Sequence, residues 1–244
     1  MTTQVPASLD NERILAFLRK GAWFGRIPAR LQTELVESGS VRNFDRGDVF
    51  GTEDQPSRGL FAILQGQALI TRQTGLDSES VMHIGGPGYW VGYIGLLTHG
   101  VLAVTATART RMRTFHLSAA QFRRITDRHP QLFRHFAELA AQNLSFTLRQ
   151  MACAMTLSTE DWLRLRLSDY ATMWRNDGVD DEVIELALSQ DEVSRMIGAS
   201  RQTVNRCLAN LEQQGLIEVG FHSIRILDPA GLRQGQRLTG LEWA

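Results

Sequence analysis

Residues 189–217 read SQDEVSRMIGASRQTVNRCLANLEQQGLI, and this stretch decides the fold of the C-terminal part of the chain. Ser189 and Glu192 have the spacing of a capping box, which predicts that a short helix begins there. Gly198 then favours a tight turn, and Ser200 is the expected N-cap of a second helix. Two short helices joined by a brief turn that contains glycine are typical of a helix-turn-helix.

The second predicted helix has an apolar face and a polar face when its residues are placed at 3.6 per turn. The apolar face consists of Val204, Cys207, Leu208 and Leu211. On the polar face we expect Arg201, Gln202 and Arg206 to contact base edges, because arginine pairs with guanine, and glutamine with adenine, through two hydrogen bonds. The residues expected to contact phosphates or base edges are Ser200, Thr203 and Asn205. Residues 216–227, LIEVGFHSIRIL, alternate as a two-stranded hairpin does, which predicts a wing after this helix.

The overall composition limits how the chain can bind its partners. The chain has 26 Lys and Arg and 26 Asp and Glu, so its net charge is zero and any DNA affinity must come from a local arrangement of arginines. No apolar run reaches the roughly 18 residues that span a membrane, and the N-terminus lacks the features of a signal peptide. Two cysteines, Cys153 and Cys207, are too few for a disulfide framework or a cysteine-rich metal site. We therefore expect a cytoplasmic protein with no membrane partner and no metal site.

The first half of the chain has the pattern of a β domain. Short apolar runs from Val41 to about Leu117 are separated by Gly, Pro, Asp and Ser, which predicts an antiparallel β sandwich or barrel. Residues 11–38 before it are expected to be helical, with a break at residues 21–28.

A long helix is predicted after His129-Pro130. Apolar residues recur in it at alternating steps of three and four, as in a coiled coil, except that Thr147 interrupts the stripe. They are Phe133, Ala137, Ala140, Leu144, Met151 and Ala154. We expect this stripe to pack on a partner subunit and another face of the helix to pack on the β domain.

These patterns divide the chain into three parts. Residues 1–129 are expected to form the β domain with its N-terminal helices, and residues 130–157 a dimerisation helix and hinge. Residues 158–244 are expected to form the winged helix-turn-helix domain. A joint near Leu157 is then expected to set the separation of the two DNA-reading domains in a dimer.

This order of elements resembles the cyclic-AMP receptor protein / fumarate-nitrate regulator (Crp/Fnr) family of bacterial transcription factors. The resemblance extends from about Ile14 to Leu227 and is most specific in the helix-turn-helix; RGDVF (46–50) and GLFAILQGQALI (59–70) match the family's glycine-spaced strands. It implies an α+β fold: an N-terminal double-stranded β-helix, that is, a jelly roll like that of cyclic-nucleotide-binding domains, a long dimerisation helix and a C-terminal winged helix-turn-helix. It also implies double-stranded DNA, a second copy of the chain and RNA polymerase as partners.

The family's recognition helix opens with Ser-Arg-Glu-Thr-Val, and this chain departs from that pattern at one position. Ser200, Arg201 and Thr203 match, whereas Gln202 stands where the acid usually is. A carboxylate accepts a hydrogen bond from cytosine, whereas a carboxamide both donates and accepts. We therefore expect the DNA half-site to differ at that base pair.

The ligand site departs more strongly from the family. Members that bind cyclic nucleotides carry Gly-Glu, where the glutamate holds the ribose, and then Arg-Ser or Arg-Thr, where the arginine neutralises the phosphate. Gly92 matches, but Tyr93 replaces the glutamate, and Leu102 and Ala103 occupy the Arg-Ser positions. An unpaired buried charge costs several kcal/mol. The sequence therefore argues against cyclic AMP bound in the usual way.

Three interpretations of the altered pocket stay open. It holds a more apolar effector, it is filled by its own side chains, or it holds haem, for which His83, His99 and His116 are candidates by residue type alone. The candidate pocket residues are Tyr89, Trp90, Gly92, Tyr93, Leu97, Leu102, Ala103, Thr147 and Leu148, of which Thr147 matches a residue that meets the purine base. An iron-sulfur cluster is not expected, because no cysteine precedes Cys153.

The predicted function is that of a homodimeric, sequence-specific transcriptional regulator. Its two recognition helices are expected to enter successive major grooves of a pseudo-palindrome, about 34 Å apart. The alternative is a ligand-binding β-barrel protein, or an enzyme, that does not contact DNA. No G-x-S-x-G, H-E-x-x-H or phosphate loop is present, so we expect no enzymatic activity.

Overall fold

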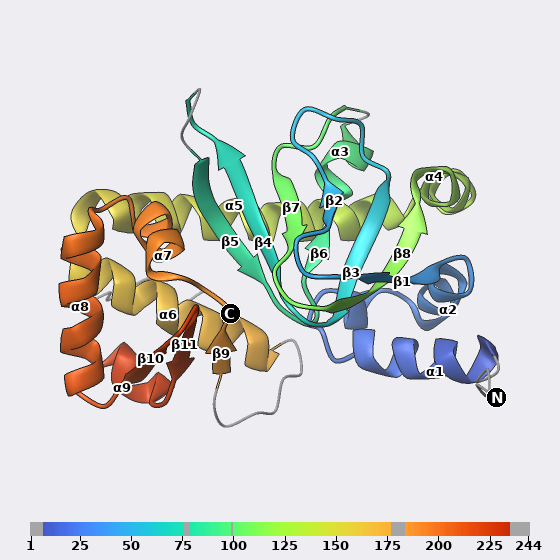
Figure 1. The fold of residues 1–244 in the computed structure, drawn as a ribbon. Coiled ribbons are helices and arrows are strands. Elements are labelled where there is room, and N and C mark those ends of the chain that lie inside the picture. The colour runs from blue at the N-terminus through green and yellow to red at the C-terminus, as the bar shows by residue number, and fades with distance from the viewer. Residues whose placement is uncertain (1–6, 76–78, 99, 177–183, 235–244) are drawn as a thin grey trace. The chain divides into compact units, whose positions relative to one another are not determined.

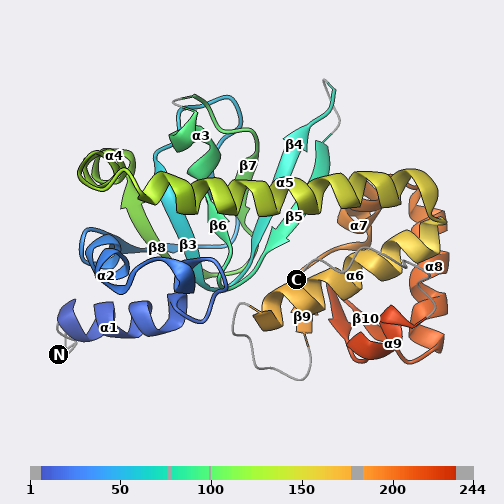
Figure 2. The ribbon, with the colours of Figure 1, turned by 180° about the vertical axis from the view of Figure 1, so that it is seen from behind.

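A computed structural model describes residues 7–75, 79–98, 100–176 and 184–234. The chain forms two compact units, which are drawn in Figures 1 and 2. The first unit runs to Leu148, and the second comprises Arg149–Met173 together with the chain from Asp181 onward. Within the described ranges, no helix combines the length and the apolar character that a membrane span requires.

Two four-stranded antiparallel sheets form the β part of the first unit. Its strands are β1 (Ser40–Phe44), β2 (Val49–Gly51), β3 (Gly59–Gln65), β4 (Ala68–Gln73), β5 (Glu79–Gly85), β6 (Trp90–Val91), β7 (Thr105–Ala108) and β8 (Met112–Ser118). The strand order is β1-β8-β3-β6 in one sheet and β2-β7-β4-β5 in the other. This arrangement confirms the predicted jelly roll.

One part of the core lies between the two sheets. Phe50 of β2, Phe61 of β3 and Ile70 of β4 are buried in one cluster with Met112 of β8. The Phe50 and Phe61 rings meet edge to face with centroids 5.4 Å apart. The apolar runs of the sequence therefore supply the inner faces of both sheets. In β3 the run is buried on both faces, since Leu60 and Ala62 belong to the second part of the core.

Helices cover the outer side of the first sheet. They are α1 (Ala7–Leu18), the 3-10 helix η1 (Phe24–Arg26), α2 (Ala29–Glu37), α3 (Tyr93–Leu97) and α4 (Ala119–Arg128). The predicted break at residues 21–28 separates α1 from α2 and contains η1. Trp23 and Phe24, at this break, pack with Trp90 and Phe136 in the second part of the core.

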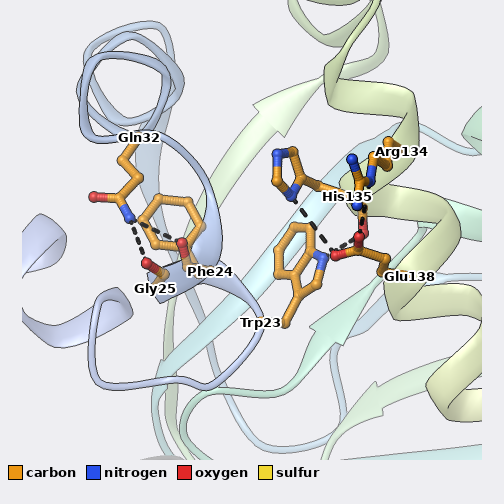
Figure 3. A network of polar contacts seen from close by, with 7 residues as sticks. All are labelled: Trp23, Phe24, Gly25, Gln32, Arg134, His135 and Glu138. Carbon is orange, nitrogen blue, oxygen red and sulfur yellow. Dashed lines mark hydrogen bonds and ion pairs between the residues drawn. The ribbon is translucent and has the colours of Figure 1, made fainter.

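Polar contacts fix the break to its surroundings (Figure 3). The indole nitrogen of Trp23 donates to the carbonyl oxygen of His135 at 2.5 Å, and the Gln32 amide donates to the carbonyl oxygen of Phe24 at 2.9 Å. His135 lies on α5 (Leu132–Thr156), whose Phe136 is fully buried. The first turns of α5 are therefore held on the β domain, and Figure 2 shows this part of the helix from the side on which it lies.

The second unit is built from helices and a small sheet. Its elements after α5 are α6 (Thr159–Asn176), β9 (Ile184–Leu186), α7 (Gln190–Ile197), α8 (Arg201–Gln213), β10 (Ile217–Gly220), β11 (Ser223–Ile226) and α9 (Pro229–Arg233). The strands form an antiparallel sheet in the order β10-β11-β9. The predicted helix at residue 159 and the predicted wing are both present.

Candidate DNA interface and effector region

The helix-turn-helix is built from α7, a short turn and α8. Ser189 caps α7 and closes a full capping box with Glu192, because the Ser189 hydroxyl accepts from the Glu192 amide and the Glu192 carboxylate accepts from the Ser189 amide. Gly198 ends α7 with a φ of 75°, a left-handed conformation that suits glycine. The Ser200 hydroxyl then accepts from the Thr203 amide and caps α8. The sequence pattern correctly predicted each of these local features.

The two faces of α8 differ sharply in exposure. Val204, Cys207, Leu208 and Leu211 are buried, with at most 4% of each residue exposed. Arg201, Gln202, Asn205 and Arg206 are exposed, as is Ser200, and Thr203 is half-buried. The six predicted contact residues therefore share the first turns of one helix, and their side chains are held there by a buried apolar face.

One carboxylate lies beside this polar face. Asp191, in the first turn of α7, has an oxygen 4.0 Å from Nε of Arg201 and another 3.5 Å from Nε of Arg195. Side-chain exposure is 54% for Asp191 and 67% for Arg201, so solvent screens this pair. Nothing in the local sequence pattern indicates this contact of Asp191, because it bridges two helices across the turn.

The wing follows α8 directly. The Glu212 carboxylate accepts from the backbone amide of Val219 at 2.8 Å, which ties β10 to the end of α8. The hairpin turns at Phe221 and His222; His222 has a φ of 55°, and Phe221 is 93% exposed. Arg225 pairs with Glu218 across the two strands at 2.8 Å.

An apolar stripe on α5 is exposed. Leu144 and Met151 are 60% and 57% exposed, Phe133 is 41% exposed, and Ala137 is also exposed, whereas Ala140 is half-buried. The opposite face of the helix is buried and includes Leu132, Phe136 and Leu139. A single chain leaves the predicted seam uncovered, although helices of water-soluble proteins normally bury their apolar stripes.

The end of α5 is fastened to α6 by a polar cluster. Asp169 accepts hydrogen bonds from Arg149, at 2.7 Å, and from the Gln150 amide. Arg166, only 3% exposed, donates to the Gln150 side chain at 2.8 Å and to the Tyr170 hydroxyl at 2.9 Å. These contacts explain why the two compact units divide between Leu148 and Arg149, inside α5 and ahead of the predicted joint near Leu157.

Tyr93, which the resemblance sets in place of a ribose-binding glutamate, has a partner within the chain. It is 6% exposed, and its hydroxyl oxygen accepts from the Asn143 side chain on α5 at 2.6 Å. Burial raises the pKa of Tyr93, and the hydrogen bond from Asn143 offsets this in part. The preceding Gly92 has a φ of 98°, and a Cβ there would lie 2.1 Å from the Gly59 carbonyl oxygen, so the close approach requires glycine.

The remaining candidate pocket residues lie in different places. Trp90 and Tyr93 belong to the core under the N-terminal helices, and Leu97 packs against it. Tyr89 packs on the core between the sheets. Thr147 and Leu148 are exposed on α5, and the backbone of Ala103 accepts a hydrogen bond from Arg72.

Leu102 lines a cavity of about 280 Å³ on the jelly roll. Its other lining residues are Val49, Phe50, Gly51, Thr52, Gln55, Pro56 and Arg58. Arg58 is the basic residue in this lining, and its place there could not be predicted because it lies far along the chain from Leu102. Asn143 was not among the predicted pocket residues, although it lies one helical turn before Thr147.

The histidines and cysteines lie in different environments. His83 is 7% exposed and packs against Tyr89 with ring centroids 4.7 Å apart, whereas His99 lies outside the described residues. Burial lowers the pKa of His116, which stacks on Phe61. Cys153 and Cys207 are free, buried thiols, and burial raises the pKa of both. Across the described ranges, no three His, Cys, Asp or Glu side chains are grouped as metal ligands.

Two family models match the chain. One, described as a Crp-like helix-turn-helix domain, matches residues 143–234. The other, described as a cyclic nucleotide-binding domain, matches residues 41–129. The matched ranges contain α8 with its wing and the jelly roll with its cavity, respectively.

Curated relatives resemble the chain over most of its length. The "CRP-like cAMP-activated global transcriptional regulator" of Mycobacterium tuberculosis is 24% identical over 226 residues, which cover 93% of this chain and 100% of that protein. The "HTH-type transcriptional regulator Cmr" of the same species is 29% identical, with 89% of this chain and 88% of that protein covered. The solved structure of FixK2 from Bradyrhizobium japonicum matches with a TM-score of 0.66 and 15% identity, over 80% of this chain and 95% of that one, and thus shares the fold.

Proposed function

Because the chain belongs to the Crp/Fnr family of DNA-binding transcriptional regulators, we propose that it acts as a homodimer that reads a pseudo-palindromic duplex with α8 of each subunit. The observation that carries this proposal is the exposed polar start of α8 above a fully buried apolar face. A recognition helix enters the major groove with its N-terminal residues on base edges. The first turns of α8 carry the polar side chains that such a contact needs.

The exposed residues of α8 can be assigned to contacts with bases and contacts with phosphates. Arg201 and Arg206 can each offer two donors to guanine, and Gln202 can pair with adenine. Ser200, whose hydroxyl caps the helix, and Thr203 lie at the helix N-terminus, where backbone amides also favour a phosphate. Asn205 completes the set on the exposed side.

The exposed stripe of α5 supports dimerisation through that helix. Leu144 and Met151 lie seven residues apart on one face, and each leaves more than half of its surface uncovered in a single chain. A second copy of α5 would cover both stripes at once, as in a two-stranded coiled coil. On this proposal residues 1–129, 130–157 and 158–244 act as the effector-like domain, the dimer helix with its hinge, and the DNA-reading domain.

The effector region supports a regulator that does not use cyclic AMP in the family's usual way. Tyr93 is buried and hydrogen-bonded to Asn143, so it offers no carboxylate to a ribose. Leu102 is apolar where the resemblance places a phosphate-binding arginine, so a phosphate in this cavity would depend on Arg58, which lines it from another part of the chain. Three interpretations stay open: side chains fill the pocket, a different effector binds, for which the cavity beside Arg58 offers space, or the domain holds haem, for which the histidines are candidates by residue type alone.

The proposed cellular location of the protein follows from its proposed DNA partner. Bacterial duplex DNA lies in the cytoplasm, so we place the protein there, with RNA polymerase as a further partner. The protein's proposed role needs no catalytic chemistry.

Two arginines of α8 provide the test. A duplex selected from a random pool by the wild-type protein should lose at least tenfold in affinity when Arg201→Ala and Arg206→Ala are combined, because each good bidentate contact is worth about 1–3 kcal/mol. Arg164→Ala with Arg233→Ala is the matched control, since it removes the same charge from side chains that bond to Gln214, at the C-terminal end of α8, and to Thr172 on α6. Equal losses in the two double variants would show that α8 does not read the bases.

A further inference from the structure

The contact between Asp191 and Arg201 stands out on the proposed DNA-reading face. A duplex carries one negative charge per roughly 1.7 Å of its axis, so a carboxylate at this surface faces like charges. Asp191 nevertheless lies within 4.0 Å of Arg201, the first residue of the recognition helix, and is itself more than half exposed. Its charge therefore acts directly on an arginine that is proposed to meet the DNA.

Capping of α7 does not explain this carboxylate. The capping box of α7 is already complete with Ser189 and Glu192. Asp191 adds a favourable charge near the helix N-terminus, but Glu192 supplies such a charge as well. The directional contacts of Asp191 are with the two arginines, Arg195 on its own helix and Arg201 across the turn.

Because the protein has no net charge, the pairing of Asp191 with Arg201 affects how strongly the protein is attracted to DNA. With 26 basic and 26 acidic side chains, the chain has no net positive field, so attraction to any duplex depends on single arginines such as Arg201. A phosphate also accepts two donors of one guanidinium, so on any duplex its attraction for Arg201 competes with that of Asp191. A guanine edge is satisfied by the two terminal nitrogens of the guanidinium, whereas the Asp191 contact is with Nε of Arg201, so the guanine contact and the Asp191 contact can form together.

We infer that Asp191 is a specificity-determining positioning residue: it holds Arg201 away from phosphates on any duplex and leaves the two terminal nitrogens of Arg201 to a guanine. This inference rests on the proposed function, since it requires Arg201 to meet bases. Asp191 then lowers the affinity for non-specific duplex more than the affinity for the selected site. Asp191 therefore increases the ratio of the affinity for the selected site to the affinity for non-specific duplex, without any added positive charge.

The test is the ratio of two dissociation constants, measured with the selected duplex and with a scrambled duplex of equal length. Asp191→Asn should tighten scrambled-duplex binding by about twofold to fivefold, the range expected for an exposed ion pair. The dissociation constant for the selected duplex should change by less than this. The ratio of the scrambled-duplex constant to the selected-duplex constant therefore falls. Asp191→Glu keeps the charge and should keep the ratio.

Two further variants separate this effect from a general gain of charge. Asp161→Asn makes the same charge change in the first turn of α6, where the carboxylate bonds to Ser158. Asp161→Asn should change the dissociation constants for the selected and the scrambled duplex by the same factor. In an Arg201→Ala background, Asp191→Asn should no longer change the ratio, because the residue through which it acts is gone. Melting temperatures of all variants show whether they fold.

The possible failures are distinct. If Asp191→Asn and Asp161→Asn have the same effect, or if the Asp191→Asn effect survives in the Arg201→Ala background, the inference about Asp191 is overturned while the proposed function stands. If Arg201→Ala itself leaves the selected-duplex affinity unchanged, the inference about Asp191 is overturned, whereas the proposed function is wrong only if the Arg201→Ala and Arg206→Ala double variant also leaves it unchanged.

Discussion

The exposed stripe of α5 allows a quantitative prediction for Leu144→Ala. Leu144 is 60% exposed in the single chain, and the proposed dimer buries that surface. Full burial of a leucine side chain is worth about 1.5–3 kcal/mol, so covering this fraction contributes roughly 1–2 kcal/mol for each copy and roughly 2–4 kcal/mol for each dimer. A tenfold change in an equilibrium constant corresponds to about 1.4 kcal/mol. The dimer dissociation constant should therefore rise roughly 30-fold to 1,000-fold.

Sedimentation equilibrium over a wide range of protein concentrations measures this constant directly. The matched control is Gln142→Ala, another exposed position on α5 that lies off the apolar stripe, and it should leave the constant unchanged. The melting temperature of Leu144→Ala should stay close to that of the wild type at concentrations where both are monomeric. A monomeric wild-type protein, or equal dissociation constants for Leu144→Ala and Gln142→Ala, would refute the reasoning.

Four other substitutions test single features of the structure. Leu211→Ala removes a fully buried side chain and should lower the free energy of unfolding by about 2–5 kcal/mol in urea titrations, whereas an exposed leucine would cost far less. Ser189→Ala removes the capping box and should cost about 1 kcal/mol in the same assay; no loss would show that the cap is not formed. Tyr93→Phe deletes the bond to Asn143 and should cost about 1 kcal/mol, an effect that an Asn143→Ala background should abolish. Burial lowers the pKa of His116, so the unfolded chain binds more protons and stability should fall as the pH drops from about 6.5 through the lowered value. His116→Asn should flatten that part of the stability curve, and an unchanged slope would count against the burial of a neutral imidazole.

Local signals in the sequence were sufficient for the DNA-reading helices. Capping residues, a glycine with positive φ and a helical stripe act within a few neighbouring residues, so they can be recognised without the fold. Ser189, Gly198 and Ser200 accordingly lie where the pattern predicts. The short apolar runs likewise predicted an antiparallel sandwich or barrel, and the resemblance to the family made this expectation a jelly roll.

Contacts between distant parts of the chain could not be predicted in this way. Tyr93 and Asn143 are 50 residues apart, and nothing near either one indicates their hydrogen bond. Arg58 joins Leu102 at one cavity only because the sheets close around it. The division of the two units within α5 was equally hidden, because the helical pattern runs without interruption through Arg149, whose partner Asp169 lies on the next helix.

The central claim is that α8 reads a specific duplex without help from cyclic AMP. The most direct test is enrichment from a pool of random duplexes by the purified wild-type protein, run in parallel with and without cyclic AMP, with the Arg201→Ala and Arg206→Ala double variant as the reference. The account predicts that the same pseudo-palindrome is enriched in both wild-type arms and is absent with the double variant. Enrichment only with cyclic AMP would contradict the interpretation of Tyr93 and Leu102. An equal outcome for the wild type and the double variant would contradict the role of α8.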